Sequence, residues 1–179
     1  MVHISRLIIC LALASLTACK ASAPETAAPD YPAPDYAAAP MDLSTPQGTA
    51  YAMMMAMYRG DAESIDKIFA NGGRLSRIRA DGSLEPDGLT GWRDWVGTLD
   101  AGQANEELFG LKVEQFGDLA TVWAPFTIRF DSKIVGCGVN QLSMARQDGH
   151  WRVVSGIDTQ APRESCETFK ETYLAEGQL

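Results

Sequence analysis

Histidine and basic residues are scarce in this chain of 179 residues, and no long apolar run is present. The two histidines, His3 and His150, cannot form a zinc-binding cluster, and only His150 lies in the mature part, too little for a serine-type relay. Lys and Arg number 15 against 23 Asp and Glu, and this acidic balance argues against a nucleic-acid partner. Gly136-Cys137-Gly138 lacks the strand-to-helix setting of a phosphate-binding loop. We expect no cofactor and no bound metal.

The N-terminus carries an export signal. Arg6 precedes an apolar stretch of about ten residues, which is too short to cross a bilayer that needs roughly 20. The sequence Leu-Thr-Ala-Cys at 16–19 resembles the lipobox of bacterial lipoproteins. The resemblance implies that Cys19 receives a diacylglyceryl group, that the chain is then cut between Ala18 and Cys19, and that the new amine of Cys19 takes a third acyl chain such as palmitate. The alternative is an ordinary secretory signal with a chance cysteine.

Membrane attachment is expected to come from the lipid alone. Without the signal peptide, 14 Lys and Arg face 23 Asp and Glu, a balance of −9 that disfavours adhesion to anionic headgroups. Lys20 stands where an aspartate would favour retention in the inner membrane. The lipoprotein resemblance therefore implies the bacterial cell envelope, at the periplasmic face of the outer membrane.

A tether and a single domain follow the signal. Residues 20–40 are rich in Ala and Pro and repeat Ala-Pro-Asp-Tyr, so we expect an extended spacer that reaches roughly 60 Å, with a weak docking motif as the alternative. The expected organisation is a signal peptide at 1–18, a lipidated cysteine and tether at 19–43, a folded domain at 44–160 and a tail at 161–179.

Capping residues and glycines delimit the elements of the first half of the domain. The predicted elements are a helix over 47–59 after Thr45, a helix over 62–69 after Asp61, a strand over 74–80 and a helix over 91–99 after Thr90.

Turns at 117–118, 131–133 and 148–149 divide residues 104–159 into four strands of an antiparallel meander. The three turns place one apolar set on one covered face of the sheet, and a slip of one residue would scatter it. Pro125 within a strand must mark a bulge or an edge. The expected pairs are Phe109–Phe126, Leu111–Ala124, Val113–Val122, Val122–Leu142, Ala124–Asn140, Met144–Val153, Leu142–Ser155 and Asn140–Ile157.

The order of helices and meander, together with three segments, resembles the nuclear transport factor 2-like superfamily, particularly its SnoaL-like and lumazine-binding-like relatives. The segments are FGDLATVWAPF at 116–126, CGVN at 137–140 and DGHWRVVSGIDT at 148–159. The resemblance implies an α+β cone in which N-terminal helices pack on a curved antiparallel sheet around a pocket. It also implies a possible homodimer through the outer sheet face, where Trp123 is expected.

The covered face offers few polar groups for chemistry. Glu107 shares its parity near a strand end, Asp158 has outward parity, and no catalytic set can be assigned. Asn140 is the clearest inward polar residue, and a buried amide needs hydrogen-bond partners. The candidate pocket residues are Tyr51, Tyr58, Trp92, Trp95, Phe126, Asn140 and Ser155, with ordinary core packing as the alternative for the aromatic ones.

Cys137 and Cys166 remain once Cys10 and Cys19 are accounted for. In an oxidising compartment we predict a disulfide that pins a short C-terminal helix to the domain, with two buried thiols as the alternative.

Three functions stay open. The leading hypothesis is a non-catalytic domain that binds a small apolar ligand or an envelope protein. The second is an isomerase, dehydratase or cyclase that uses Tyr51 or Tyr58 with Asn140. The third is a purely structural envelope component.

Overall fold

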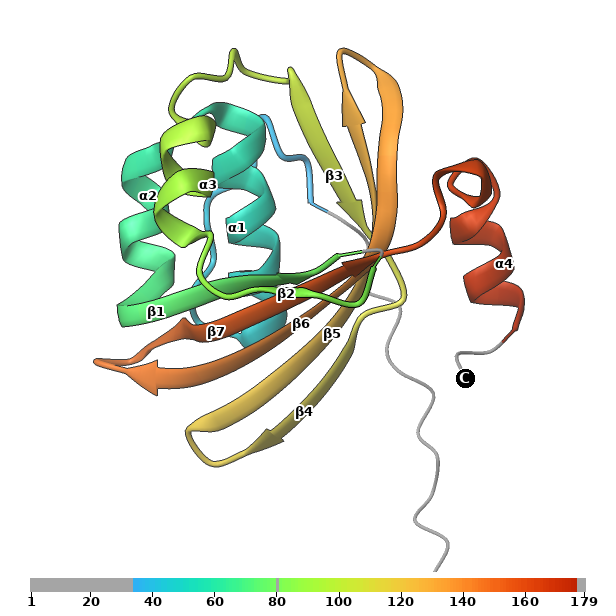
Figure 1. The fold of residues 1–179 in the computed structure, drawn as a ribbon. Coiled ribbons are helices and arrows are strands. Elements are labelled where there is room, and N and C mark those ends of the chain that lie inside the picture. The colour runs from blue at the N-terminus through green and yellow to red at the C-terminus, as the bar shows by residue number, and fades with distance from the viewer. Residues whose placement is uncertain (1–33, 80, 177–179) are drawn as a thin grey trace, which may run out of the picture.

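A computed structural model describes residues 34–79 and 81–176, and Figure 1 shows its fold. Three helices cover one face of a strongly curved sheet of seven strands, and a fourth helix lies on the opposite side. This is the predicted α+β cone. The lipobox, the cleavage site at Ala18 and the lipidation site at Cys19 lie outside the described residues, so those predictions stay untested.

Helix α1 (Pro46–Arg59) is the centre of the core. The Thr45 hydroxyl accepts a hydrogen bond from the backbone N–H of Gly48 (3.0 Å), as the predicted N-cap requires. The helix ends at Gly60, whose φ of +67° favours a residue without a side chain. Residues 49–57 are all buried, so this helix is covered on every side and the aromatic and methionine stripe is core.

Helices α2 (Ala62–Ile68) and α3 (Leu89–Val96) form the outer part of the helical layer. Asp61 caps α2 as predicted, by accepting from the N–H of Ser64. The predicted Thr90 cap of the third helix is wrong, because α3 begins one residue earlier and Gly88 precedes it without a side-chain cap. Among the described helices, none has the length and apolarity to cross a bilayer.

The sheet is mixed, which corrects the expectation of a purely antiparallel one. Strand β1 (Phe69–Ile78) runs parallel to β7 (His150–Gln160) and pairs on its other side with the short β2 (Leu84–Glu85). The sheet order is β2-β1-β7-β6-β5-β3, and β4 also pairs with β5. The remaining strands are β3 (Ala104–Leu108), β4 (Lys112–Phe116), β5 (Leu119–Phe130) and β6 (Lys133–Gln147).

The meander registers are confirmed next to the 117–118 and 148–149 turns and wrong beyond two irregularities. At the 131–133 turn the loop has two residues and not three, because Phe130 pairs with Lys133, and a shift between Ile128 and Arg129 restores the predicted register beyond it. The pairs Val113–Val122, Val122–Leu142, Ala124–Asn140 and Met144–Val153 are observed.

The first irregularity lies at residues 109–111, which separate β3 from β4 opposite Pro125, so that Leu108 and not Phe109 faces Phe126. The Phe109 N–H donates to the Pro125 carbonyl there (3.1 Å). The shift reverses the parity of β3: Glu106 points into the cone, and Glu107 contacts Lys170 of the tail.

The second irregularity is a β-bulge in β7. The register shifts between Ser143 and Met144 of β6, so that Ser155 pairs with Ser143 and Asp158 with Asn140. Beyond Val154 every side chain of β7 therefore changes face. Asp158 is buried at 6% exposure, whereas Ile157 is only half-buried. The predictions that Ser155 faces inward and Asp158 outward are both wrong for this reason.

Residues 34–43, expected as part of the tether, fold back along α1. We call this segment the N-terminal strap. Arg59 at the end of α1 donates to the carbonyls of Tyr36 (2.7 Å) and Ala39 (2.5 Å). The N–H of Trp151 donates to the carbonyl of Leu43 (2.8 Å). The strap is thus held at both ends, and its Tyr36 side chain belongs to the core.

The C-terminal tail docks on the outer sheet face as predicted. A disulfide joins Cys137 to Cys166, and α4 (Phe169–Ala175) follows a short 3-10 turn at Arg163–Ser165. The rings of Phe169 and Tyr173 pack against Phe109, with centroids 6.0 Å apart in each case. The indole N–H of Trp123 donates to the Tyr173 hydroxyl (3.0 Å), so the tail occupies part of the face expected to dimerise.

Candidate functional site

Five polar side chains gather at one end of the covered face, at the edge of an otherwise apolar core. We call them the cone cluster: Tyr36 from the strap, Arg77 from β1, Glu106 from β3, Asn140 from β6 and Asp158 from β7.

Glu106 and Asn140 form the inner part of the cone cluster. The amide Nδ2 of Asn140 donates to Oε1 of Glu106 (2.7 Å), and both residues are buried, at 7% and 9% exposure for Asn140 and Glu106. Burial raises the pKa of Glu106 to about 7; the bond from Asn140 opposes this rise, and the charge of Asp158 adds to it. Near neutral pH this carboxyl can therefore either donate or accept a proton.

Asp158 and Arg77 form the outer part of the cone cluster. The Nε of Arg77 lies 2.9 Å from both carboxylate oxygens, and Nη2 lies 2.6 Å from Oδ2. The Asp158 side chain is 7% exposed, whereas the Arg77 side chain is 49% exposed. Hydrogen bonding to Asp158 raises the pKa of Arg77. The pair thus links the buried carboxylates to solvent through one guanidinium.

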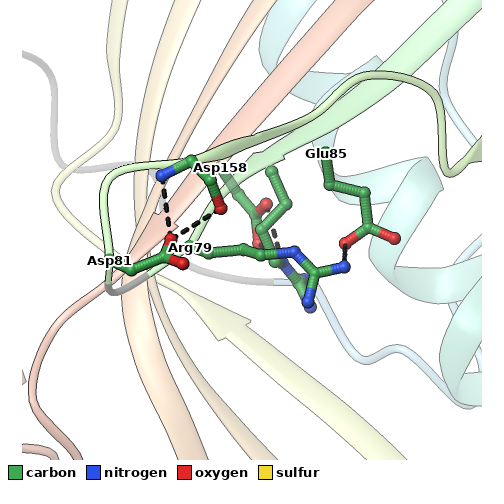
Figure 2. Close-up of polar contacts among 6 residues, drawn as sticks. Arg79, Asp81, Glu85 and Asp158 are labelled. Carbon is green, nitrogen blue, oxygen red and sulfur yellow. Dashed lines mark hydrogen bonds and ion pairs between the residues drawn. The ribbon is translucent and has the colours of Figure 1, made fainter.

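Figure 2 shows Asp158 beside the β1–β2 hairpin, which carries Arg79, Asp81 and Glu85. Arg79 pairs with Glu85 (2.9 Å), and Asp81 accepts from the Ser83 backbone N–H (2.9 Å). These contacts are exposed, so each adds little to stability. Their effect is to shape the hairpin next to the cone cluster.

Tyr36 closes the cone cluster from the helical side. Its ring meets those of Tyr58 and Tyr51, with centroids 6.1 and 6.5 Å away. Its hydroxyl is buried and makes no hydrogen bond of good geometry within the described part of the chain, although the backbone N–H of Leu108 lies near enough to affect its pKa. Burial raises the pKa of Tyr36, the backbone of Leu108 opposes this rise, and Tyr51 and Glu106 add to it. A buried hydroxyl without a partner costs about 1–3 kcal/mol.

The predicted pocket residues are only partly brought together. Asn140 belongs to the cone cluster, and Tyr58 touches it through Tyr36. Tyr51 and Phe126 are buried core side chains. The other three predicted residues lie away from the cone cluster. Trp92 packs on Phe69, Trp95 is 37% exposed, and Ser155 lies beyond the bulge in β7.

Four members of the cone cluster were missed by reasoning from the sequence. Glu107 was expected on the covered face in place of Glu106, and Asp158 on the outer face, because β3 and the end of β7 both lie beyond a register irregularity. Arg77 enters through the parallel pairing of β1 with β7, which a meander does not contain. Tyr36 lies in a segment whose composition indicates a tether. The repeated Ala-Pro-Asp-Tyr was the one signal that could have pointed to it.

The fold has counterparts among solved structures. The chain is similar to an NTF2-like protein of unknown function from Shewanella baltica (16% identity, 64% of this chain and 89% of that one, TM-score 0.50). It is also similar to a candidate dehydratase of the NTF2-like family from Streptomyces avermitilis (18% identity, 68% and 96%, TM-score 0.54). A protein of unknown function from Mycobacterium tuberculosis gives 18% identity, 68% and 73% coverage and a TM-score of 0.54.

These similarities show that the domain has the nuclear transport factor 2-like fold, as the sequence resemblance implied. No family model and no curated protein sequence matches the chain. At such low identities the fold alone is transferred, and function must be argued from the site.

Proposed function

We propose that the chain is a lipoprotein of the bacterial outer membrane, anchored through Cys19, whose NTF2-like domain binds a small ligand in the cone without transforming it. The lipobox resemblance and the acidic, non-adhesive domain support the anchor. The cone cluster supports the binding site.

The observation that carries the binding proposal is the Tyr36 hydroxyl, which is buried near Glu106 and makes no hydrogen bond of good geometry with the described residues. A ligand that hydrogen-bonds to this hydroxyl recovers the cost of its burial. The surroundings are aromatic, and a low-dielectric site disfavours a charged ligand. We therefore propose a small, largely apolar molecule with one hydroxyl or carbonyl group, which reaches the cone cluster when the strap shifts.

The binding test uses the full chain with Cys19→Ser, which needs no detergent if the anchor proposal holds. The probe is 2-naphthol, and naphthalene is the matched control without a hydroxyl. We expect 2-naphthol to raise the melting temperature more than naphthalene does, and Tyr36→Phe to remove the difference. Equal responses to both probes in the parent chain would contradict a polar contact in the cone.

The anchor is tested separately by cell fractionation. We expect the parent chain in the membrane fraction and the Cys19→Ser chain in the soluble periplasmic fraction. The folded domain should give the same melting curve in both chains. A Cys19→Ser chain that stays with the membranes would contradict anchoring through this cysteine.

The pKa of Glu106 near 7 favours a second candidate function, an enzyme of the isomerase or dehydratase kind. Glu106 would remove and return a proton at the carbon next to a carbonyl group of the substrate. The Tyr36 hydroxyl would donate a hydrogen bond to the enolate oxygen that develops. Deuterium exchange at the α-carbon of 2-tetralone in D2O, followed by NMR, tests this activity. Exchange that Glu106→Gln abolishes would favour the enzyme. If exchange is no faster than in buffer alone, the enzyme is contradicted and the non-catalytic binding proposal stands.

The outer sheet face is the proposed surface for a second copy or an envelope protein. The tail covers its Phe109 end, whereas Phe116 (89% exposed) and Leu119 (60%) stay open at the β4–β5 turn. Light scattering tests this, since a dimer that Phe116→Ser dissociates would support it. A monomer at all concentrations would contradict self-association.

A further inference from the structure

A groove of about 560 Å³ lies away from the cone cluster, on the helical side of the molecule. It is bounded by α2, the start of β1, the start of α3 and the strands next to the β6–β7 turn. Figure 1 shows α2 passing into β1 at the left of the molecule, with α3 beside α2 and the β6–β7 hairpin below β1. The volume falls within the range of small-molecule sites.

The groove is formed by a bulge in β1. Phe69 pairs with Val153 and Arg74 with Ser155, so residues 70–73 have no register partners on β7. Gly72, with a φ of +76°, lets the chain make this detour, and a side chain added there would meet nothing within 4 Å. The detour opens a space above an apolar floor that includes Ile65, Phe69 and Leu89.

The wall of the groove offers hydrogen-bonding groups that the protein does not use. The side chains of Asn71, Thr90 and Gln147 are exposed and make no hydrogen bond with the described part of the chain. Arg152 donates through Nη1 to the carbonyl of Lys67, near the end of α2. This guanidinium has no carboxylate partner among the described residues, and four of its five N–H groups remain for a ligand.

The other guanidinium of the groove is already neutralised. Arg93 donates to both oxygens of Asp66, with two distances of 2.8 Å. The lining residues thus leave one uncompensated positive charge, that of Arg152, in a protein whose net charge is −8. Screening over about 8 Å at physiological salt limits the repulsion that an anion feels from the rest of the molecule.

We propose that this groove is a second binding site, which takes a small organic acid with a single negative charge. Its carboxylate meets Arg152, its apolar body lies on the floor around Phe69, and Asn71, Thr90 and Gln147 supply neutral hydrogen bonds at the rim. One positive charge and an apolar floor match a monocarboxylate of short chain length. The site is independent of the cone cluster and of the function proposed for it.

The experiment is calorimetric titration of the full chain carrying Cys19→Ser with octanoate, and with octanol as the uncharged probe. We expect octanoate to bind more tightly than octanol, and its affinity to fall as salt is added. Arg152→Gln should weaken octanoate binding about tenfold or more, since a hydrogen bond to a charged group is lost.

Two further variants guard against an effect on folding. Thr90→Trp fills the exposed wall without touching Arg152 and should also abolish octanoate binding. Arg129→Gln is the matched control, because this exposed guanidinium likewise donates to a backbone carbonyl, that of Ser132 (3.5 Å), and has no carboxylate partner among the described residues. It should leave octanoate binding unchanged.

Two results would overturn the proposal. One is equal affinity of the parent chain for octanoate and octanol, or equal affinity of the parent chain and of Arg152→Gln for octanoate. The other is binding to phosphatidylglycerol vesicles without binding to octanoate, which would assign the groove to a membrane headgroup and not to a free acid.

Discussion

The two ends of the covered sheet face have opposite character although the same strands run through both. Near the β6–β7 turn the face is apolar and solid, with Met144, Val153 and Trp151 each at most 1% exposed. At the other end β6 and β7 present Asn140 and Asp158, which meet Glu106. The bulge at Val154 lies between the two ends. One extra residue in β7 therefore separates the part of the cone that holds the fold together from the part that can do chemistry.

Trp151 tests the apolar end. Replacing it with Ala should lower the free energy of unfolding by about 3–5 kcal/mol, because a large, fully buried side chain leaves a cavity. Urea denaturation measures the change. Trp123→Ala, which truncates an indole that is 44% exposed, is the control and should cost clearly less. Equal losses would show that the two tryptophans do not differ in packing.

Glu106 tests the polar end through pH. Its pKa is near 4.5 when unfolded and about 7 when folded, so the folded state binds more protons between these values. Stability should therefore fall by about 3 kcal/mol as pH rises from 4.5 to 7, and this contribution should then stay constant. Glu106→Gln removes the dependence.

The free energy of unfolding of Glu106→Gln, relative to that of the parent chain, should consequently be higher at pH 8 than at pH 4. Melting curves from pH 4 to pH 8 measure it. A variant whose difference from the parent is the same at every pH would show that Glu106 ionises normally in the fold.

Tyr36 tests whether the strap leaves the polar end unsatisfied. Tyr36→Phe removes a buried hydroxyl without a partner and should raise the free energy of unfolding by about 1 kcal/mol. Tyr58→Phe, on the half-buried neighbouring ring, is the control with little expected change. Destabilisation by Tyr36→Phe would mean that the hydroxyl has a partner in solution.

Asp158 should produce the smallest effect. Its charge raises the pKa of Glu106, whereas that of Arg77 lowers it. Asp158→Asn should therefore lower the Glu106 pKa below about 7, and this pKa change by itself alters stability at neutral pH by less than about 1 kcal/mol, apart from the loss of the ion pair with Arg77. An NMR titration of the Glu106 side-chain carboxyl measures the midpoint. A midpoint that rises would show that the released Arg77 no longer faces Glu106.

The contrast between the two ends also explains what the sequence could predict. Turn residues and alternation fix the strand pairs close to the 117–118 and 148–149 turns, so Val113–Val122 and Met144–Val153 are correct. A bulge has no comparable signal in the alternation of residues: Val154 and Ser155 read as ordinary strand positions. The helices were predictable from caps and glycines, and the disulfide from compartment and count.

The candidate site was less predictable because its members depend on long-range geometry. Asn140 was placed correctly because the pairing of β6 with β5 that was predicted for it is observed, while Asp158 lies beyond the bulge in β7 and was not. Arg77 depends on a parallel pairing between strands about 80 residues apart in sequence. Tyr36 depends on Arg59, whose guanidinium holds a strap that composition alone describes as unfolded.

The grip of Arg59 on the strap has a mechanical consequence. In a chain held at Cys19, as proposed, a pull on the domain enters the described structure at residue 34. The first contacts to bear it are the hydrogen bonds from Arg59 to Tyr36 and Ala39, which lie at the Tyr36 end of the strap. Tension on the anchor would therefore load Arg59 at the end of α1 first, and Tyr36 would leave Glu106 and open the cone only after these two bonds had broken.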